Sequence, residues 1–198
     1  MTTRAEHAEA DAMSAIHRLF YAIRPDLGAQ AEMSSSGAQL CKALGIVGHT
    51  VANGRLHVTL HWLGDHTELP ADLVERALVA GASVEVAPFD VIFDRAECLG
   101  RDGGLVALTA SRGTGSLRRF QRALAGAMTE AGIGRYVRSS FRPHVSLVYG
   151  DRQIERQTIA PIRWAVNELV LIHSVVGQSR HIVLGRWSLQ TRQLDLGW

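Results

Sequence analysis

The chain has 198 residues, of which 46% are hydrophobic and 20% are charged, and its formal net charge is +2. This length and composition predict one large globular domain or two small lobes that share a core, and they exclude both a multi-domain machine and a chain that is disordered throughout. The small net charge argues against binding of long duplex nucleic acid, and no apolar run approaches the roughly 18 residues that span a bilayer. The first residues lack the apolar segment of a signal peptide, so we expect a cytoplasmic protein.

Strands and helices are expected to follow one another irregularly along the chain. Residues 1–15 are predicted to be an N-terminal tail, which leaves 16–198 as a single domain. A helix is expected from Pro25 to about Leu44, broken or loosened by Ser34–Gly37, and two more over 70–79 and 115–131. Strands are expected at 17–24, 55–63, 89–99, 105–110, 141–149, 163–176 and 181–189, the third and fourth forming a hairpin. Because helices interrupt hairpins here, the order predicts an α+β fold.

The cysteines and basic residues give weaker indications. Cys41 and Cys98 lie far apart with no CxxC spacing, so we expect buried free thiols and neither a thiolate metal site nor a redox motif. The 21 basic residues are arginines except for Lys42. Guanidinium groups suit phosphate recognition, although such a bias can also reflect composition alone.

One short pattern occurs twice. The first motif, His57–Leu60, reads His-Val-Thr-Leu, and the second motif, His144–Leu147, reads His-Val-Ser-Leu. A Gly-Asp pair follows each motif, and a predicted helix precedes each. This repeat predicts two structurally equivalent lobes.

Each motif pairs an imidazole with a hydroxyl group. Side chains two positions apart on a strand point to the same face, so His57 should lie beside Thr59 and His144 beside Ser146. Two facing pairs would place two groups of near-neutral pKa on either side of one phosphorus atom. One imidazole could remove a proton from the nucleophile and the other could protonate the leaving oxygen, while the hydroxyls hold the phosphate.

The other histidines have less support as functional groups. A single His-x-Thr on an apolar strand is most often a core residue, and only the repetition favours function here. His57 and His61 could be a metal pair on a helix, but Val58–Leu60 favours a strand and no acidic third ligand accompanies them. His173 and His181 are expected to be structural or surface groups, and we expect no metal and no cofactor.

The two motifs and their flanking segments resemble the 2H phosphoesterase superfamily, and within it the RNA 2′,3′-cyclic phosphodiesterases, also called 2′-5′ RNA ligases. The resemblance runs from Leu19 to about Leu189 and includes FYAIRPD, PFDVIFDRAECLG and the closing LVLIHSVVGQSRHIVLGRWSL. It implies a bilobal fold, with two antiparallel sheets related by a pseudo-twofold axis around a central cleft and helices on the outer faces. It also implies metal-independent hydrolysis of a 2′,3′-cyclic phosphate to a 2′-phosphate. By this resemblance His57 would protonate the leaving 3′-oxygen and His144 would activate water, with Thr59 and Ser146 binding the phosphate.

The chain departs from the family after the second motif. Many relatives have a basic residue where this chain has Tyr149, which could stack on a base but cannot neutralise a phosphate. Arg142 shares the face of His144 and is the candidate substitute. Serine in place of the commoner threonine in the second motif keeps the hydroxyl.

The expected partners are RNA ends or small cyclic nucleotides, with no membrane, and we expect a monomer. The same acid and base would also permit the reverse reaction, 2′-5′ ligation. An ATP-dependent ligase is disfavoured because Lys42 does not lie in a KxDG context. The alternative is a non-catalytic RNA- or nucleotide-binding module, against which the two intact histidines argue.

Overall fold

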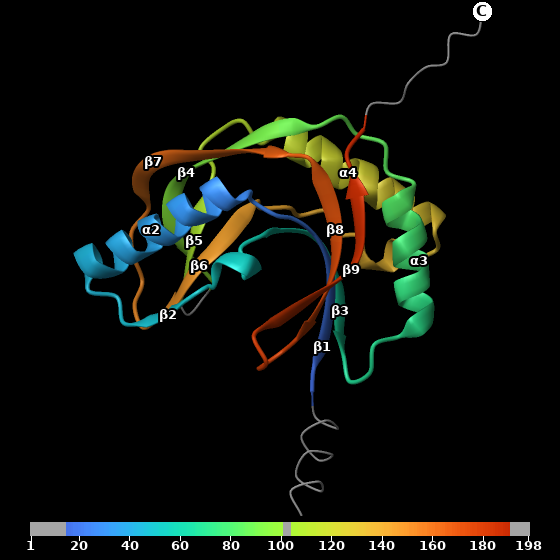
Figure 1. Cartoon of the computed structure of the whole chain (residues 1–198), viewed down its shortest axis with the longest axis horizontal. Helices are drawn as coiled ribbons and strands as arrows, with labels where there is room; N and C mark the ends of the chain where they lie inside the picture. The colour runs from blue at the N-terminus through green and yellow to red at the C-terminus, as the bar shows by residue number, and fades with distance from the viewer. Residues whose placement is uncertain (1–14, 101–103, 191–198) are drawn as a thin grey trace, which may run out of the picture.

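The computed structural model describes residues 15–100 and 104–190, so the predicted tail lies outside the described residues except for Ala15. Two antiparallel sheets form the two lobes, and helices cover their outer sides (Figure 1). This arrangement confirms the predicted α+β fold with two antiparallel sheets. No helix in the described part of the chain is long and apolar enough to cross a membrane.

Each sheet contains one of the two motifs. The four-stranded sheet has the order β3 (Val58–His66), β1 (His17–Ile23), β8 (Glu168–Val175) and β9 (Arg180–Ser188). The five-stranded sheet has the order β2 (Gly48–Thr50), β6 (His144–Gly150), β5 (Leu105–Thr109), β4 (Phe89–Leu99) and β7 (Gln157–Val166). The predicted hairpin is confirmed, since β4 pairs with β5 from Arg95 opposite Thr109 to Leu99 opposite Leu105.

The helices pack by their apolar faces. α2 (Leu27–Leu44) lies on the five-stranded sheet against β6 and β7, while α3 (Ala71–Ala82) packs on β8 and β9. α4 (Gly115–Glu130) packs on α3 and β3 and buries Leu117, Phe120, Leu124 and Met128, which recur at helical spacing. Two short 3-10 turns, η1 (Asn53–Arg55) and η2 (Gly134–Tyr136), complete the described elements. The larger of two hydrophobic clusters contains residues of both sheets and of these helices, and a smaller one consists of Phe20, Ala22, Val170 and Ile172 on β1 and β8.

The expected break in the first helix is wrong. α2 is continuous, and the side chain of Asp26 caps it by accepting from the backbone N–H of Ala29 at 2.8 Å. Gly37 is buried, and a Cβ there would lie 3.8 Å from the Cβ of Leu147. A side chain there would make ordinary contact with β6, so the contact does not require glycine, and the helix continues through this residue despite its low helix propensity.

The expected strand 163–176 is also wrong, because it is two strands in different sheets. Val166 ends β7 opposite Phe89, and Glu168 begins β8 opposite Ser188. The chain crosses between the lobes at Asn167, whose carbonyl oxygen accepts from the N–H of Leu189 at 2.8 Å. Both strands are apolar, so their hydrophobic pattern runs through the crossing without a turn signal.

The structure also differs from the sequence-based expectations at two strand starts, at one additional strand and at the cysteines. β3 begins at Val58 and β6 at His144, which leaves the residues before each motif outside the ladders. β2 was not predicted, because three exposed residues carry no periodic signal. Cys41 and Cys98 are free, as expected, but half-buried rather than buried.

Candidate active site

The fold brings the two motifs together from the two sheets. His57 lies directly before β3, and His144 is the first residue of β6. β3 and β6 contact one another although they belong to different sheets. The two imidazoles are close enough that the charge of His144 affects the pKa of His57.

Both histidines make the same hydrogen bond. The Nδ1–H of His57 donates to the carbonyl oxygen of Arg55 at 2.6 Å, and that of His144 donates to the carbonyl oxygen of Arg142 at 3.0 Å. A carbonyl oxygen only accepts, so this contact assigns the proton of each neutral ring to Nδ1. Each motif therefore holds its Nε2 available to take up or release a proton.

The hydroxyls of the motifs also occupy equivalent places. Thr59 lies opposite Ala22 on β1, and Ser146 lies opposite Ala107 on β5. Paired residues of an antiparallel ladder share a face, and an alanine leaves room above the hydroxyl. Both hydroxyl residues are half-buried and lie on the same face as the imidazole of their motif.

A β-bulge follows each hydroxyl. The register of β3 with β1 leaves Leu60 unpaired, and the register of β6 with β5 leaves Leu147 unpaired. Such an extra residue shifts the side-chain alternation by one position. The shift moves His61 and Val148 to the core face and returns Trp62 and Tyr149, 39% and 55% exposed, to the face of the histidines.

The surroundings of His57 are aromatic and basic. Its ring stacks on Phe20 with centroids 4.9 Å apart, and His181 on β9 meets it edge-on at 5.3 Å. Burial lowers the pKa of His57 to about 4, although its bond to the Arg55 carbonyl opposes this, and the charges of His144, Arg55 and Arg24 lower it further. His57 is therefore neutral near pH 7 in the ligand-free protein.

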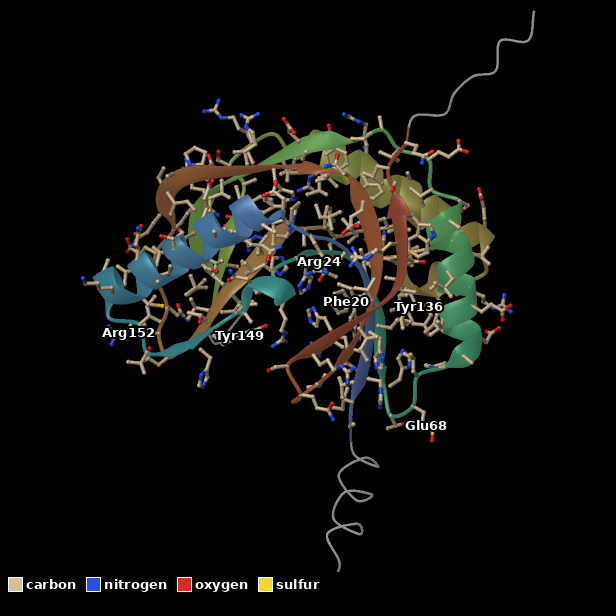
Figure 2. All side chains as sticks on the ribbon, viewed as in Figure 1. Phe20, Arg24, Glu68, Tyr136, Tyr149 and Arg152 are labelled. Atoms are coloured by element: carbon tan, nitrogen blue, oxygen red, sulfur yellow. The ribbon has the colours of Figure 1, made fainter. Side chains whose placement is uncertain are left out.

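His181, expected to be a structural or surface group, lies beside His57. Burial lowers its pKa to about 4, and the charges of His57, Arg55 and Arg24 act in the same direction. Phe20 also contacts His181 edge-on, with ring centroids 5.6 Å apart. The three rings form one cluster at the centre of the molecule, where Figure 2 shows Phe20 and Arg24 between the two lobes.

Of the two residues predicted around the second motif, Tyr149 faces the other lobe and Arg142 turns aside. Tyr149 lies close enough to Arg18 to contribute to its raised pKa, after the larger effect of the hydrogen bond from Arg18 to Asp65. The side chain of Arg142 instead forms an ion pair with Glu97, with Nη2 2.8 Å from Oε2. Arg142 thus points away from the position that the basic residue of relatives would occupy.

His57 and His61 were considered as a possible metal pair, but the bulge at Leu60 turns His61 toward the core, away from the face of His57. His61 is buried in the core, and its Nε2 lies 3.0 Å from the carbonyl oxygen of Gln121 on α4. Within the described ranges, no three His, Cys, Asp or Glu side chains gather as a metal site would require.

Sequence reasoning missed Phe20, Arg24, Arg55, Trp62 and His181. A longer repeat was present, because each motif has an arginine two residues before its histidine and an aromatic residue five after it. The alternation of β1 places Phe20 and Ala22 on one face, and Arg24 follows directly after the strand, two residues beyond Ala22. No sequence signal joins His181 to His57, because β9 reaches the site only through the order of the sheet.

A sequence model of the 2′-5′ RNA ligase superfamily matches residues 39–178, which include both motifs. The chain belongs to this superfamily. Its members act on phosphoesters, which identifies the chain as an enzyme of that class. Among curated proteins, a search by sequence finds no match.

Solved structures agree with this assignment. The apo form of E. coli LigT is 25% identical, covers 90% of this chain and 100% of its own, and superposes with a TM-score of 0.70. LigT complexed with 3′-AMP is likewise 25% identical, covering 89% of this chain and 99% of its own with a TM-score of 0.67. TT0787 of Thermus thermophilus, at 22% identity, shares the fold, with a TM-score of 0.71 over 88% of this chain and 99% of its own.

Proposed function

We propose that the enzyme hydrolyses the 2′,3′-cyclic phosphate of an RNA end or a small nucleotide to a 2′-phosphate. The observation that carries this proposal is the matched geometry of the two histidines, each bonded through Nδ1 and open at Nε2. LigT has been crystallised with 3′-AMP, ATP and phosphate, which supports a nucleotide ligand here as well.

In this reaction one imidazole accepts a proton from water as the oxygen attacks phosphorus. The bond between phosphorus and the 3′-oxygen breaks, and the other imidazole gives its proton to that oxygen. The hydroxyls of Thr59 and Ser146 donate to the non-bridging oxygens, where negative charge develops. With a 5′-hydroxyl in place of water as the nucleophile, the same proton transfers would break the bond to the 3′-oxygen and leave a 2′-5′ linkage.

The low pKa of His57 bears on which imidazole is the acid. The family resemblance assigns the acid to His57, yet this ring is neutral in the ligand-free protein at neutral pH. A bound phosphate carries negative charge, which favours the protonated imidazole and raises its pKa. His57 therefore gains its proton with the substrate, while His144 acts as the base.

Arg24 and Arg55 replace the basic residue that relatives have at the position of Tyr149. Both charges act on His57 and on His181, so both lie beside the reacting groups. Arg24 is held by a hydrogen bond from its Nη2 to the carbonyl oxygen of Gly54 at 3.0 Å. Tyr149 is left to stack on a base of the substrate.

The test is incubation with each nucleoside 2′,3′-cyclic phosphate and with an oligoribonucleotide that ends in one, followed by phosphorus NMR. A 2′-phosphomonoester product is expected. A 3′-phosphate product, or binding without turnover, would contradict the proposed reaction, and the second outcome would favour the non-catalytic module.

A further inference from the structure

A separate cavity of about 340 Å³ lies beside the beginning of β6. Four arginines and one carboxylate, that of Glu97, are among its lining residues: Arg95, Arg118, Arg142 and Arg156. A second carboxylate, that of Asp94, does not line the cavity but pairs with Arg95 at 3.7 Å, so the arginines remain in excess. We call this cavity the arginine pocket. An excess of guanidinium groups around one cavity favours an anionic ligand.

Glu97 holds two of these arginines in place. Its Oε2 lies 2.8 Å from Nη2 of Arg142 and 3.0 Å from Nη2 of Arg156, while its Oε1 accepts from Thr109 at 2.6 Å. Burial would raise the pKa of Glu97, but the bonds from Thr109, Arg156 and Arg142 lower it, so the carboxylate is ionised. A guanidinium has more N–H donors than these contacts occupy, so both arginines keep donors for a ligand.

The beginning of α4 also lines the arginine pocket, through Thr114 and Arg118. Arg118 in its first turns donates through Nη1 to the carbonyl oxygen of Phe141 at 2.8 Å, which fixes the guanidinium. Thr114, the N-cap residue, lines the pocket, and no acidic side chain occupies the first turn. The positive end of the helix dipole therefore adds to the charge of the arginines.

The pocket lies on the same face as His144. Arg95 pairs with Thr109, and Thr109 pairs with His144, so the three side chains share one face of the sheet. Two strand spacings separate Arg95 from His144, which is about 10 Å. Arg142 is only two residues from His144 in the chain. One substrate molecule can therefore occupy the reaction site and the pocket together.

We propose that the arginine pocket binds a second phosphate of the substrate, on the 5′ side of the nucleotide that carries the cyclic phosphate. This inference rests on the proposed function and narrows its substrate class. Guanidinium forks match phosphate oxygens in geometry and charge. A nucleoside 2′,3′-cyclic phosphate has no second phosphate and leaves the pocket empty. The end of an oligoribonucleotide fills it with a phosphodiester.

The first experiment compares kcat/KM for three substrates: adenosine 2′,3′-cyclic phosphate, the same compound with a 5′-phosphate, and the dinucleotide ApA ending in the cyclic phosphate. We expect about tenfold or greater preference for the substrates with a second phosphate. A preference for the 5′-phosphorylated mononucleotide over the dinucleotide would assign the pocket to a terminal phosphate, and the opposite order to an RNA backbone. Equal values of kcat/KM for all three substrates would contradict the binding of a second phosphate in the arginine pocket.

The second experiment uses Arg156→Gln, whose side chain is 64% exposed, and Arg118→Gln. Each should lower the preference for the dinucleotide about tenfold and weaken the salt dependence of its KM. The matched control is Arg76→Gln, which removes an equal charge from an ion pair with Asp72 on the surface of α3. A preference that stays at the wild-type value in both pocket variants would overturn the proposal.

Failure of the proposed reaction can be distinguished from failure of the proposed pocket. If none of the three substrates is cleaved, the proposed reaction is wrong. Binding measurements then test whether the arginine pocket holds a second phosphate. The dinucleotide ApA ending in a 2′-phosphate should bind more tightly than adenosine 2′-phosphate by isothermal titration, and Arg156→Gln should remove that difference. Equal affinities would contradict the pocket.

Discussion

His57 and His144 make the same hydrogen bond to the residue two positions back, yet the side chains around them differ. His57 lies beside the edge strand of its sheet, between Phe20 and His181. His144 begins an interior strand that has β2 on one side and β5 on the other.

The arginines that precede the two histidines differ in the same way. Arg55 is half-buried, and its charge lowers the pKa of His57. Arg142 is exposed and turned toward Glu97. The two motifs thus hold their imidazoles by the same Nδ1 bond. The neighbouring elements decide which imidazole is desolvated and which charges act on it.

Removal of either imidazole is the most severe test of this pairing. His57→Ala and His144→Ala should each lower kcat/KM for a 2′,3′-cyclic nucleotide roughly 10²- to 10⁴-fold, the range for loss of one general acid or base. The double variant should lose much less than the product of the two effects, because the groups act on one displacement. A variant near the wild-type rate would remove that histidine from the mechanism.

Loss of an arginine beside His57 should have a smaller effect than loss of an imidazole. Arg24→Gln removes a charge beside His57 and should lower kcat/KM about tenfold for the mononucleotide, as for loss of one charged contact to phosphate. Arg76→Gln on the surface of α3 is the control. An Arg24 variant as active as this control would contradict a phosphate role for Arg24.

The aromatic residues after the bulges should affect binding more than turnover. Trp62→Ala and Tyr149→Ala should each raise KM by about one order of magnitude, since stacking of a base on an aromatic ring is worth about 1–3 kcal/mol. Tyr149→Phe keeps the ring and should retain the wild-type KM. Loss of affinity in Tyr149→Phe would indicate a role for the hydroxyl instead of the ring.

The charge environment of His57 predicts a titration. Its imidazole should titrate near pH 4 by NMR in the ligand-free protein, and Arg24→Gln should raise that pKa because a nearby positive charge is lost. Addition of inorganic phosphate should raise it as well. A His57 pKa near 6.5 in the wild-type protein would contradict the burial of this ring.

The same shift predicts how stability depends on pH. Because the folded pKa of His57 lies below its unfolded value of 6.5, its contribution is complete above pH 6.5 and is lost as the pH falls toward 4. His181 contributes in the same window. Thermal melts should therefore show a falling Tm from pH 7 to pH 4, and a smaller fall in His181→Phe.

Two imidazoles and two hydroxyls are predicted to suffice, so removal of metal should have the smallest effect. Exhaustive EDTA treatment should leave kcat/KM unchanged, and the rate should follow a bell-shaped pH profile. Loss of activity restored by zinc or manganese would make His57 and His144 candidate ligands instead of proton carriers.

The sequence by itself determined the fold class and suggested the chemistry that we propose. The repeated His-x-Thr/Ser pattern selected His57, Thr59, His144 and Ser146 as candidate site residues, because strand periodicity fixes which side chains share a face. The irregular order of strands and helices predicted α+β, and the amphipathic pattern placed α4. These signals are local, and each depends on residues a few positions apart.

Only the tertiary structure decided which distant residues surround the histidines. The crossing at Asn167 sends β7 and β8 into different sheets, and this topology brings His181 on β9 to His57. Arg142 was predicted to replace the basic residue that relatives have at the position of Tyr149, but its guanidinium forms an ion pair with Glu97 instead. Pairing across sheets and desolvation of a ring depend on contacts between residues far apart in the chain, which no short pattern of side chains encodes.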